Sequence, residues 1–452
     1  MTNDSPAKSA ERAAPKSYHV QNFGCQMNVY DGARISEMLD DQGMTAAAKE
    51  HADLVVLNTC HIREKAAEKV YSEIGRIRKK HGSDAMVAVA GCVAQAEGAE
   101  ITRRSKSVDI VVGPQAYHKL PDMVRGARNG QPQVDLDLPG LDKFDALPRA
   151  RKSSPSSFLT VQEGCDKFCT YCVVPYTRGE EISRGFAALV DEAKALVDGG
   201  AKEITLLGQN VNAWSGEDHA GRAVGLPGLI RALDKIEGLH RIRYTTSHPN
   251  DMTGELIAAH GDVSKLMPYL HLPVQAGSNR ILKAMNRSHS AESYCDILRR
   301  VREVRPDIAL SGDFIVGFPG ESDADFEATM QLVREVKYAQ AYSFKYSPRP
   351  GTPAATMDDQ IAPEVMDERL QRLQALLSEQ QLAFNRSVIG RECDILLERT
   401  GKLDGQLLGK TPWLQSAHVN MPGLAIGDMV RIRITEGRHS SVSGEVLNEV
   451  SA

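Results

Sequence analysis

The stretch from Gln162 to Cys172 reads Gln-Glu-Gly-Cys-Asp-Lys-Phe-Cys-Thr-Tyr-Cys and follows a predicted strand. Its cysteines, Cys165, Cys169 and Cys172, are separated by three and then two residues, which places three thiolates on one short loop. Thiolates are the usual ligands of iron–sulfur clusters, and four of them normally close one. A structural zinc site also takes four ligands, yet no further Cys or His lies within ten residues. The loop therefore predicts a four-iron cluster with one open iron.

An open iron of this kind suits S-adenosylmethionine (SAM). The amino and carboxylate groups of SAM can chelate it, and one electron then releases a 5′-deoxyadenosyl radical. Three short segments just past predicted strands favour a SAM pocket, because ligands of parallel α/β folds bind at the carboxyl ends of strands. Glycines there would let a ligand approach the backbone closely, although Gly-rich turns also end many strands for steric reasons. The candidate residues are Gly208, Gln209, Ser247, Gly317, Gly320 and Glu321.

Strands and helices alternate from about residue 158 to residue 346, a pattern typical of a parallel sheet covered by helices. Six such units predict a partial (β/α)6 barrel. Its strands are expected at Phe158–Gln162, Glu203–Leu207, Arg241–Thr246, Tyr269–Leu272, Ile308–Val316 and Ala341–Lys345. A helix from Pro363 to about Asn385 follows, with Met366, Leu370, Leu373, Leu377 and Phe384 on one apolar face that we expect to pack on the barrel.

The chain before the barrel shows the same alternation and predicts a parallel α/β domain. Its strands are expected at Tyr18–Phe23, Asp53–Asn58, Ala85–Ala90 and Asp109–Val112, with helices such as Asp31–Leu39 and Arg63–Arg78 between them. Residues 129–157, with four prolines, are expected to form a linker. The last sixty residues alternate apolar and charged side chains with period two, which predicts a small antiparallel β-barrel. The domains expected are therefore 17–128, 151–386 and 389–450.

Three further cysteines, Cys25, Cys60 and Cys92, each come just after a predicted strand of the first domain. In a parallel sheet these positions meet at one edge. They could hold a second cluster with one open iron, whereas cysteines that are merely buried would be scattered. We expect core packing for Cys295, which shares a helical face with Leu298 and Val301, and for Cys393. His61 is expected to be a solvated loop residue, although it could hydrogen-bond a cluster sulfide.

Composition and charge narrow the class of protein. The net charge of −5 gives no global sign of nucleic-acid binding, so any RNA-binding potential must be local. Candidates are Arg431 and Arg433 on a predicted outer strand face and the basic run from Arg149 to Lys152. No apolar run is long enough to span a membrane, and the first sixteen residues read as a disordered tail rather than a secretory signal. We therefore expect a cytoplasmic protein.

Several segments resemble the radical SAM methylthiotransferases. Asn22-Phe-Gly-Cys-Gln-Met-Asn28, Asn58-Thr-Cys-His-Ile-Arg-Glu-Lys65 and Gly91-Cys92 are similar to the N-terminal domain of that family. The stretch from Gln162 to Arg184 is close to its MiaB type, which modifies tRNA. The C-terminal barrel resembles a TRAM domain, the RNA-binding module of the family. The resemblance covers nearly all of residues 17–449.

The resemblance implies a specific reaction, the conversion of N6-isopentenyl-adenosine beside the tRNA anticodon to its 2-methylthio derivative. Two 4Fe-4S clusters and SAM are the implied cofactors. Cys165, Cys169 and Cys172 would hold the SAM-cleaving cluster, and Cys25, Cys60 and Cys92 the auxiliary cluster, while Tyr171 would lie near the adenine of SAM. The implied partners of a monomeric enzyme are tRNA, an electron donor such as a flavodoxin or ferredoxin, and iron–sulfur assembly proteins.

The chemistry agrees with this reading, because no protein base could remove the hydrogen on carbon 2 of adenine and a carbon radical can. Two alternatives stay open. The first is a sister methylthiotransferase that acts on threonylcarbamoyl-adenosine in tRNA or on a ribosomal-protein aspartate. Gln26-Met27-Asn28 and Thr177-Arg178-Gly179-Glu180 favour the isopentenyl-adenosine branch over it. The second is a non-catalytic RNA-binding protein that uses its cluster as a sensor, and the SAM-pocket segments argue against it.

Overall fold

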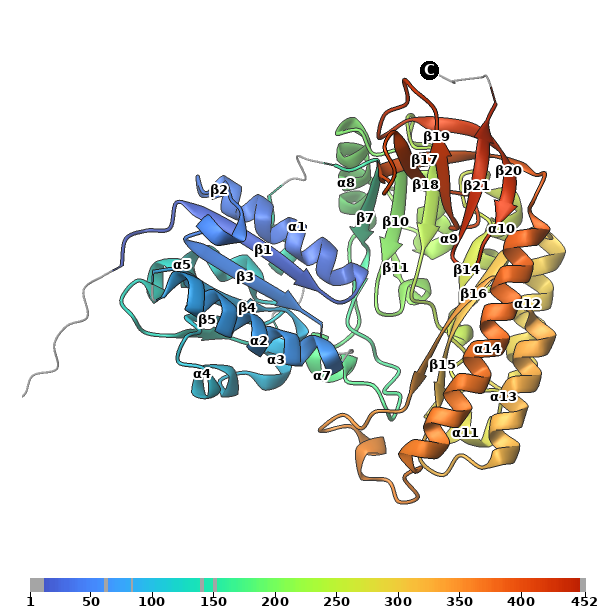
Figure 1. The fold of residues 1–452 in the computed structure, drawn as a ribbon, viewed down its shortest axis with the longest axis horizontal. Helices are drawn as coiled ribbons and strands as arrows, with labels where there is room; N and C mark the ends of the chain where they lie inside the picture. The colour runs from blue at the N-terminus through green and yellow to red at the C-terminus, as the bar shows by residue number, and fades with distance from the viewer. Residues whose placement is uncertain (1–11, 61–63, 83, 139–141, 149–152, 448–452) are drawn as a thin grey trace, which may run out of the picture. The chain divides into compact units, whose positions relative to one another are not determined.

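In the computed structural model the described residues are 12–60, 64–82, 84–138, 142–148 and 153–447 (Figure 1). The chain divides into two compact units. The first contains residues 1–150 together with Val173–Ile182, and the second contains Arg151–Cys172 and Ser183–Ala452. Among the described residues no helix has the length and apolar character that crossing a membrane requires.

The first unit is built on a six-stranded parallel sheet with the order β2-β1-β3-β4-β5-β6. Its central strands are buried along their whole length, since helices cover both faces of a parallel sheet. Apolar side chains of α1 and α5 pack on one face and those of α2, α3 and α4 on the other. The strands are β1 (Ser17–Phe23), β2 (Thr45–Ala46), β3 (Leu54–Thr59), β4 (Met86–Ala90), β5 (Ile110–Val112) and β6 (Gln133–Asp135). The helices are α1 (Gln26–Asp41), α2 (Glu64–His81), α3 (Cys92–Glu97), α4 (Glu100–Arg104), α5 (Leu120–Ala127), α6 (Asp142–Asp145) and α7 (Val174–Arg178).

The four predicted strands of this unit are confirmed, but the linker prediction for residues 129–157 is wrong in part. Strand β6 pairs in parallel with β5, and α6 follows it. The short polar sequence of β6 carries no hydrophobic alternation, so only its pairing with a neighbour makes it a strand. The disordered-tail prediction is wrong for Arg12, whose guanidinium lies 2.7 Å from Asp109. Residues 1–11, His61 and the basic run 149–152 lie outside the described residues.

The second unit contains the six predicted βα strands in two parallel sheets, β13-β10-β7 and β14-β15-β16. A parallel bridge between Ile242 and Leu266 continues the first sheet toward β14, which gives the expected partial barrel. The strands are β7 (Ser156–Thr160), β10 (Glu203–Leu207), β13 (Arg241–Tyr244), β14 (Tyr269–His271), β15 (Ala309–Val316) and β16 (Gln340–Lys345). Its helices are α8 (Phe186–Asp198), α9 (Leu226–Leu233), α10 (Gly254–Asp262), α11 (Asn279–Ala284), α12 (Ala291–Val304) and α13 (Asp323–Val336). A hairpin of β11 (Ser215–Glu217) and β12 (Ala223–Gly225) and the two-residue strands β8 (Gln162–Glu163) and β9 (Ile182–Ser183) complete the β-structure of this region.

A long helix and a closed barrel complete the second unit. Helix α14 (Pro363–Ser387) packs along β16, as its apolar face predicts, and buries Leu373 and Leu377 (Figure 1). The five strands that follow close into a barrel in the order β17-β18-β19-β21-β20. Its pairs are antiparallel as predicted, except that β19 and β21 are parallel. The strands are β17 (Glu392–Thr400), β18 (Gln406–Lys410), β19 (Ser416–Asn420), β20 (Met429–Gly437) and β21 (Ser441–Val446), and Cys393 points into their core, as expected.

Candidate functional site: two three-cysteine edges

Cys25, Cys60 and Cys92 lie at one edge of the first unit's sheet. Cys25 directly precedes α1, Cys60 follows the last residue of β3, and Cys92 is the first residue of α3. Strands β1, β3 and β4 are parallel neighbours, so their carboxyl ends meet at this edge. The side chains of Cys25 and Cys60 hydrogen-bond each other, and the backbone N–H of Cys60 donates to the carbonyl of Phe23 at 2.9 Å. The structure therefore places three sequence-distant thiols at one sheet edge, although in the described part of the chain no three His, Cys, Asp or Glu side chains are arranged as they would be around a metal ion.

Asparagines and glycines shape this edge. Asn58 donates to Asn22 Oδ1 at 3.0 Å and to the carbonyl of Asn28 at 2.7 Å, and the thiol of Cys25 donates to Asn28 Oδ1 at 3.1 Å. A Cβ at Gly24 would lie 2.2 Å from the Cβ of Cys60, and one at Gly91 would lie 2.5 Å from Asn58 Oδ1. The residues that surround the cysteines in the sequence motifs thus hold the three strand ends together.

A buried ion pair lies beside these thiols. Arg178, the last residue of α7, is 2.7 Å from Asp31 of α1, and the side chains are 2 % and 1 % exposed. The hydrogen bond from Cys60, opposed by burial and aided by the charge of Arg178, lowers the pKa of Cys25 to about 6. Burial raises the pKa of Cys92, although Arg178 hydrogen-bonds to it and acts in the opposite direction. A cation at this edge favours thiolates, the form that ligates iron.

The second three-cysteine set lies on the loop after β8 in the second unit, where two glutamines fix its first residues. The fully buried Gln162 accepts hydrogen bonds from the backbone N–H groups of Gln209 and Asn210 at 2.9 and 3.0 Å and donates to the carbonyl of Gly164 at 2.6 Å. Gln209 Oε1 in turn accepts from the N–H of Gly164 at 2.7 Å. A Cβ at Gly208 would lie 2.6 Å from Gln162 Oε1. Gly208 and Gln209 therefore hold the start of the loop.

The far side of the loop is held by the segment after α11. Thr170 donates through its N–H to Met285 and through Oγ1 to Ala284, at 3.1 and 2.9 Å. Arg287 Nη1 lies 3.9 Å from the sulfur of Cys169 and donates a long hydrogen bond to it. Lys167 lies 2.8 Å from Asp251, which follows β13. The loop is thus supported from two barrel segments, and the buried cation of Arg287 acts on Cys169 and Cys172.

Polar atoms near this loop fit a bound ligand. In the described part of the chain, Ser247 Oγ and Arg287 Nε are buried and have no hydrogen-bond partner, which is costly unless a ligand satisfies them. His248 and His289 pack edge to face with 5.7 Å between ring centroids. Burial, together with the charge of Arg287, lowers the pKa of His289 to about 4 and that of His248 to about 2, so both rings are neutral near pH 7.

The Gly317–Glu321 segment has a structural role that the sequence did not indicate. Gly317 has φ +71°, and a Cβ there would lie 2.2 Å from Met366 of α14. Glu321 Oε2 accepts from the N–H of Gly317 at 2.7 Å and from Arg369 of α14 at 2.8 Å. Close approach of helix α14 is therefore a further reason for glycine at position 317, and its role near a ligand stays a prediction. A Cβ at Gly320 would meet only Arg280, at 3.9 Å.

Tyr171 is half-buried and packs against an apolar cluster that includes Phe318 and Tyr346. Burial raises the pKa of its hydroxyl well above the ordinary value.

Sequence reasoning missed Gln162, Arg287 and His289 as site residues. Gln162 could have been noticed because a polar residue ending an apolar strand needs a partner, whereas nothing in the sequence placed Arg287 beside Cys169.

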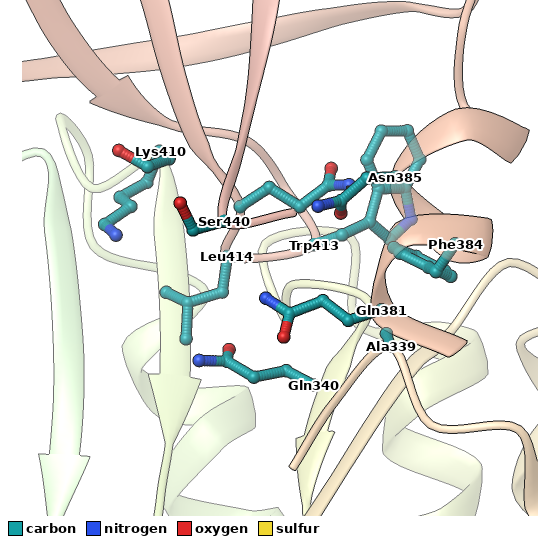
Figure 2. Close-up of a pocket in the computed structure, with 11 residues that line it drawn as sticks. Ala339, Gln340, Gln381, Phe384, Asn385, Lys410, Trp413, Leu414 and Ser440 are labelled. Atoms are coloured by element: carbon teal, nitrogen blue, oxygen red, sulfur yellow. The ribbon is translucent and has the colours of Figure 1, made fainter. Parts of the chain in front are cut away.

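A separate cavity of about 80 Å³ lies between β16, α14 and the C-terminal barrel (Figure 2). Gln340, Gln381, Asn385 and Lys410 are among its lining residues, and Gln415 donates to Asn385 at 2.6 Å. A ligand of nucleotide size needs several hundred cubic ångströms, so this cavity is a polar junction with room for a few waters. It contains none of the predicted site residues.

Three family models match the chain. The uncharacterized protein family UPF0004 matches residues 17–113, the radical SAM superfamily residues 159–333, and the TRAM domain residues 386–447. Among solved structures, the radical SAM methyltransferase TsrM from Kitasatospora setae is 13 % identical with a TM-score of 0.56, over 75 % of this chain and 77 % of that one. OxsB, a cobalamin-dependent radical SAM enzyme, has a TM-score of 0.51 at 12 % identity, over 80 % of this chain and 56 % of its own. These likenesses support the fold.

Curated relatives are far more similar. A protein from Sphingopyxis alaskensis named tRNA-2-methylthio-N(6)-dimethylallyladenosine synthase is 68 % identical over 97 % of this chain and 99 % of the relative. A relative of the same name from Zymomonas mobilis is 65 % identical over 97 % of this chain and 98 % of the relative. Another from Novosphingobium aromaticivorans is 64 % identical over 99 % of this chain and 100 % of the relative. With the radical SAM match, an iron–sulfur cluster and SAM are the cofactors of this transferase. The chain belongs to the tRNA-2-methylthio-N(6)-dimethylallyladenosine synthase family of radical SAM enzymes.

Proposed function

We propose that this enzyme adds a methylthio group to carbon 2 of N6-isopentenyl-adenosine beside the anticodon of tRNA. The observation that carries the proposal is 64–68 % identity, over nearly the whole chain, to relatives that bear this activity in their names. A TRAM domain match supports tRNA as the substrate. The same relatives disfavour the alternatives, a sister enzyme acting on threonylcarbamoyl-adenosine or a ribosomal protein and a non-catalytic sensor.

We further propose two four-iron clusters. Cys165, Cys169 and Cys172 would hold the one that contacts SAM, and Cys25, Cys60 and Cys92 the auxiliary one. Each set offers three thiols, the first on the loop after β8 and the second at strand ends, and thiolates are the donors that such clusters take. When bound, the first cluster and SAM supply the radical that removes the hydrogen on carbon 2, and the auxiliary cluster supplies sulfur.

The residues of the chain then have defined tasks. Gln162 and Gln209 hold the loop of the first cysteine set, and Arg287 offsets the negative charge of its thiolates. Ser247 Oγ and Arg287 Nε, both buried without a partner in the described residues, would bind polar groups of SAM. Tyr171, Gly208, Gln209, Gly317, Gly320 and Glu321 complete the proposed SAM-binding set, the last three by shaping the loop after β15. Neutral His248 and His289 would contact SAM without adding charge.

The remaining partners are proposals as well. A flavodoxin or ferredoxin would deliver the electron, and iron–sulfur assembly proteins would load the clusters of a cytoplasmic, monomeric enzyme.

Nucleoside mass spectrometry of bulk tRNA tests the function. Cells that lack this chain should accumulate N6-isopentenyl-adenosine and lose its 2-methylthio derivative, and the intact gene should restore it. Loss of a methylthio group on threonylcarbamoyl-adenosine instead would assign the chain to the sister branch.

A further inference from the structure

Arg178 of the first unit is a buried cation that the proposed reaction does not yet use. It is 3 % exposed, and it ends the short helix α7, which packs against α3, the helix that begins with Cys92. Its backbone carbonyl accepts a hydrogen bond from Gln115 at 3.2 Å, and Gly179, with φ +82°, ends the helix directly after it. The backbone therefore holds this side chain at the cysteine edge.

The charges around Arg178 fall into two groups. On one side its guanidinium pairs with Asp31 at 2.7 Å, two turns into α1 from Cys25. On the other side it hydrogen-bonds to Cys92, and its charge acts on Cys25. Burying an arginine is costly unless anions compensate its charge. The guanidinium thus lies between a carboxylate and the cysteines, where thiolates and an anionic cluster would be a further anionic partner.

We propose that Arg178 is a positioning residue for the auxiliary cluster, and that the Arg178–Asp31 pair sets the reduction potential of that cluster. The inference rests on the proposed function, because it requires a cluster at Cys25, Cys60 and Cys92. Reduction adds one negative charge to the cluster. A nearby cation stabilises the reduced form and a nearby carboxylate destabilises it, through a low-dielectric interior that screens charges weakly.

The two residues therefore act in opposite directions. Arg178→Gln removes the cation and should make the midpoint potential of the auxiliary cluster more negative. Asp31→Asn removes the anion and should make it more positive. A purely structural role of the pair predicts similar damage from either change, so the opposite signs separate charge from packing.

The experiment uses the full chain with Cys165, Cys169 and Cys172 replaced by Ala, so that only the auxiliary cluster can form. The protein is reconstituted anaerobically, its iron is counted, and its reduction is followed by potentiometric titration with electron paramagnetic resonance. Arg78→Gln is the matched control, since Arg78 forms an ion pair with Asp109, 3.0 Å away, which directly precedes β5 at the opposite end of the sheet. This control should leave the midpoint potential unchanged.

Each outcome decides one question. If the variant with Cys165, Cys169 and Cys172 replaced by Ala does not hold about four irons per chain, the auxiliary cluster is refuted, and the proposed function with it. If the variants hold iron and the midpoint potential shifts in opposite directions in Arg178→Gln and Asp31→Asn, the inference is supported. If they hold iron but the potential does not shift, or shifts in the same direction in both, the inference is overturned. If Arg178→Gln fails to retain iron, Arg178→Lys and Asp31→Asn carry the test. The lysine variant keeps the charge and should stay close to the parent, and a parent-like potential in Asp31→Asn would overturn the inference.

Discussion

The backbone at Gly24 and Gly91 requires glycine at the sheet edge where Cys25, Cys60 and Cys92 lie. Gly24 has φ +126°, a conformation that residues with a Cβ rarely adopt, and Cys60 fills the space beside it. Gly91 has φ +86° and borders Asn58 and the carbonyl of Thr59. These glycines are needed because two strand ends approach each other more closely than side chains would permit.

Gly24→Ala is expected to displace Cys60 and to abolish the auxiliary cluster. The added Cβ would be 2.2 Å from the Cβ of Cys60, and the backbone strain adds about 1–3 kcal/mol. Reconstituted protein should then hold about four irons per chain instead of about eight, counted against protein concentration. Gly43→Ala is the control, since Gly43 has φ +79° but nothing within 4 Å of the new Cβ. Full iron content in Gly24→Ala would mean that Cys60 is not a ligand.

At the scale of elements, buried ion pairs and hydrogen bonds connect strands β10 and β13 of the second unit to the C-terminal barrel. Glu203 of β10 is 3.0 Å from Arg243 and 3.6 Å from Arg241, both on β13. The same arginines donate to backbone carbonyls of the barrel, including those of Lys410 and Thr411 at 2.8 and 2.9 Å. One carboxylate therefore holds two cations that fasten β17–β21 to the sheet.

Glu203→Gln should destabilise the second unit by about 3–5 kcal/mol, because two buried arginines lose their counter-ion. Burial alone would raise the pKa of Glu203, but Arg243 and Arg241 hold it below its ordinary value. The contribution is therefore present above pH of about 4 and is lost as the pH falls further. Urea unfolding followed by tryptophan fluorescence measures it, since both tryptophans, Trp214 and Trp413, lie in this unit. Exposed Glu217→Gln should match the parent, and equal unfolding of all three proteins would contradict the prediction.

Arg431 and Arg433 on β20 point outward as predicted, but each has an acidic partner on β17. Arg433 lies 2.7 Å from Glu392, and Arg431 lies 3.4 Å from Asp394. The sequence alternation placed them on the outer face, and only the pairing of β17 with β20 shows that their charge is partly balanced. Any phosphate contact must compete with these carboxylates.

Changing Arg431 and Arg433 to Glu is expected to weaken tRNA binding and to make its salt dependence shallower, because fewer counter-ions are released. The matched pair Glu392→Gln with Asp394→Asn frees the guanidiniums and should have the opposite effect. Filter binding across a salt series measures both. If neither pair changes affinity or slope, the RNA surface lies elsewhere, with residues 149–152 as the next candidate.

At the scale of the whole molecule, the two proposed clusters belong to separately packed units with their own cores. The first unit contains Cys25, Cys60 and Cys92, and the second contains Cys165, Cys169 and Cys172. Cleavage of SAM and donation of sulfur should therefore be separable by mutation.

A variant with Cys25, Cys60 and Cys92 all changed to Ala should still release 5′-deoxyadenosine from SAM under reduction, yet make no methylthio product. Chromatography of the reaction measures the first, and nucleoside mass spectrometry of the tRNA the second. The converse variant, with Cys165, Cys169 and Cys172 changed to Ala, should lose both. Retained iron and circular dichroism control for folding. Methylthio product from the first variant would place the sulfur donor outside the first unit.

Local sequence was sufficient for much of the fold. Strand β4 is apolar throughout and β3 begins with four apolar residues, a pattern that predicts strands because both faces of a central parallel strand are buried. The spacing of Cys165, Cys169 and Cys172 indicated a metal-binding loop because nearby residues on a tight loop must lie close together. Cys25, Cys60 and Cys92 could be gathered at one edge because parallel strands align their ends.

Tertiary structure alone decided the rest. The polar strand β6 forms by pairing with β5, and Met366 of α14 lies where a Cβ at Gly317 would be. Arg178 follows Cys172 by six residues in the sequence, yet packs with Asp31 and Cys92 in the first unit. A sequence pattern reports the burial and periodicity of a residue's own element. Which distant charge or side chain lies against it depends on how elements pack, and no local pattern encodes that.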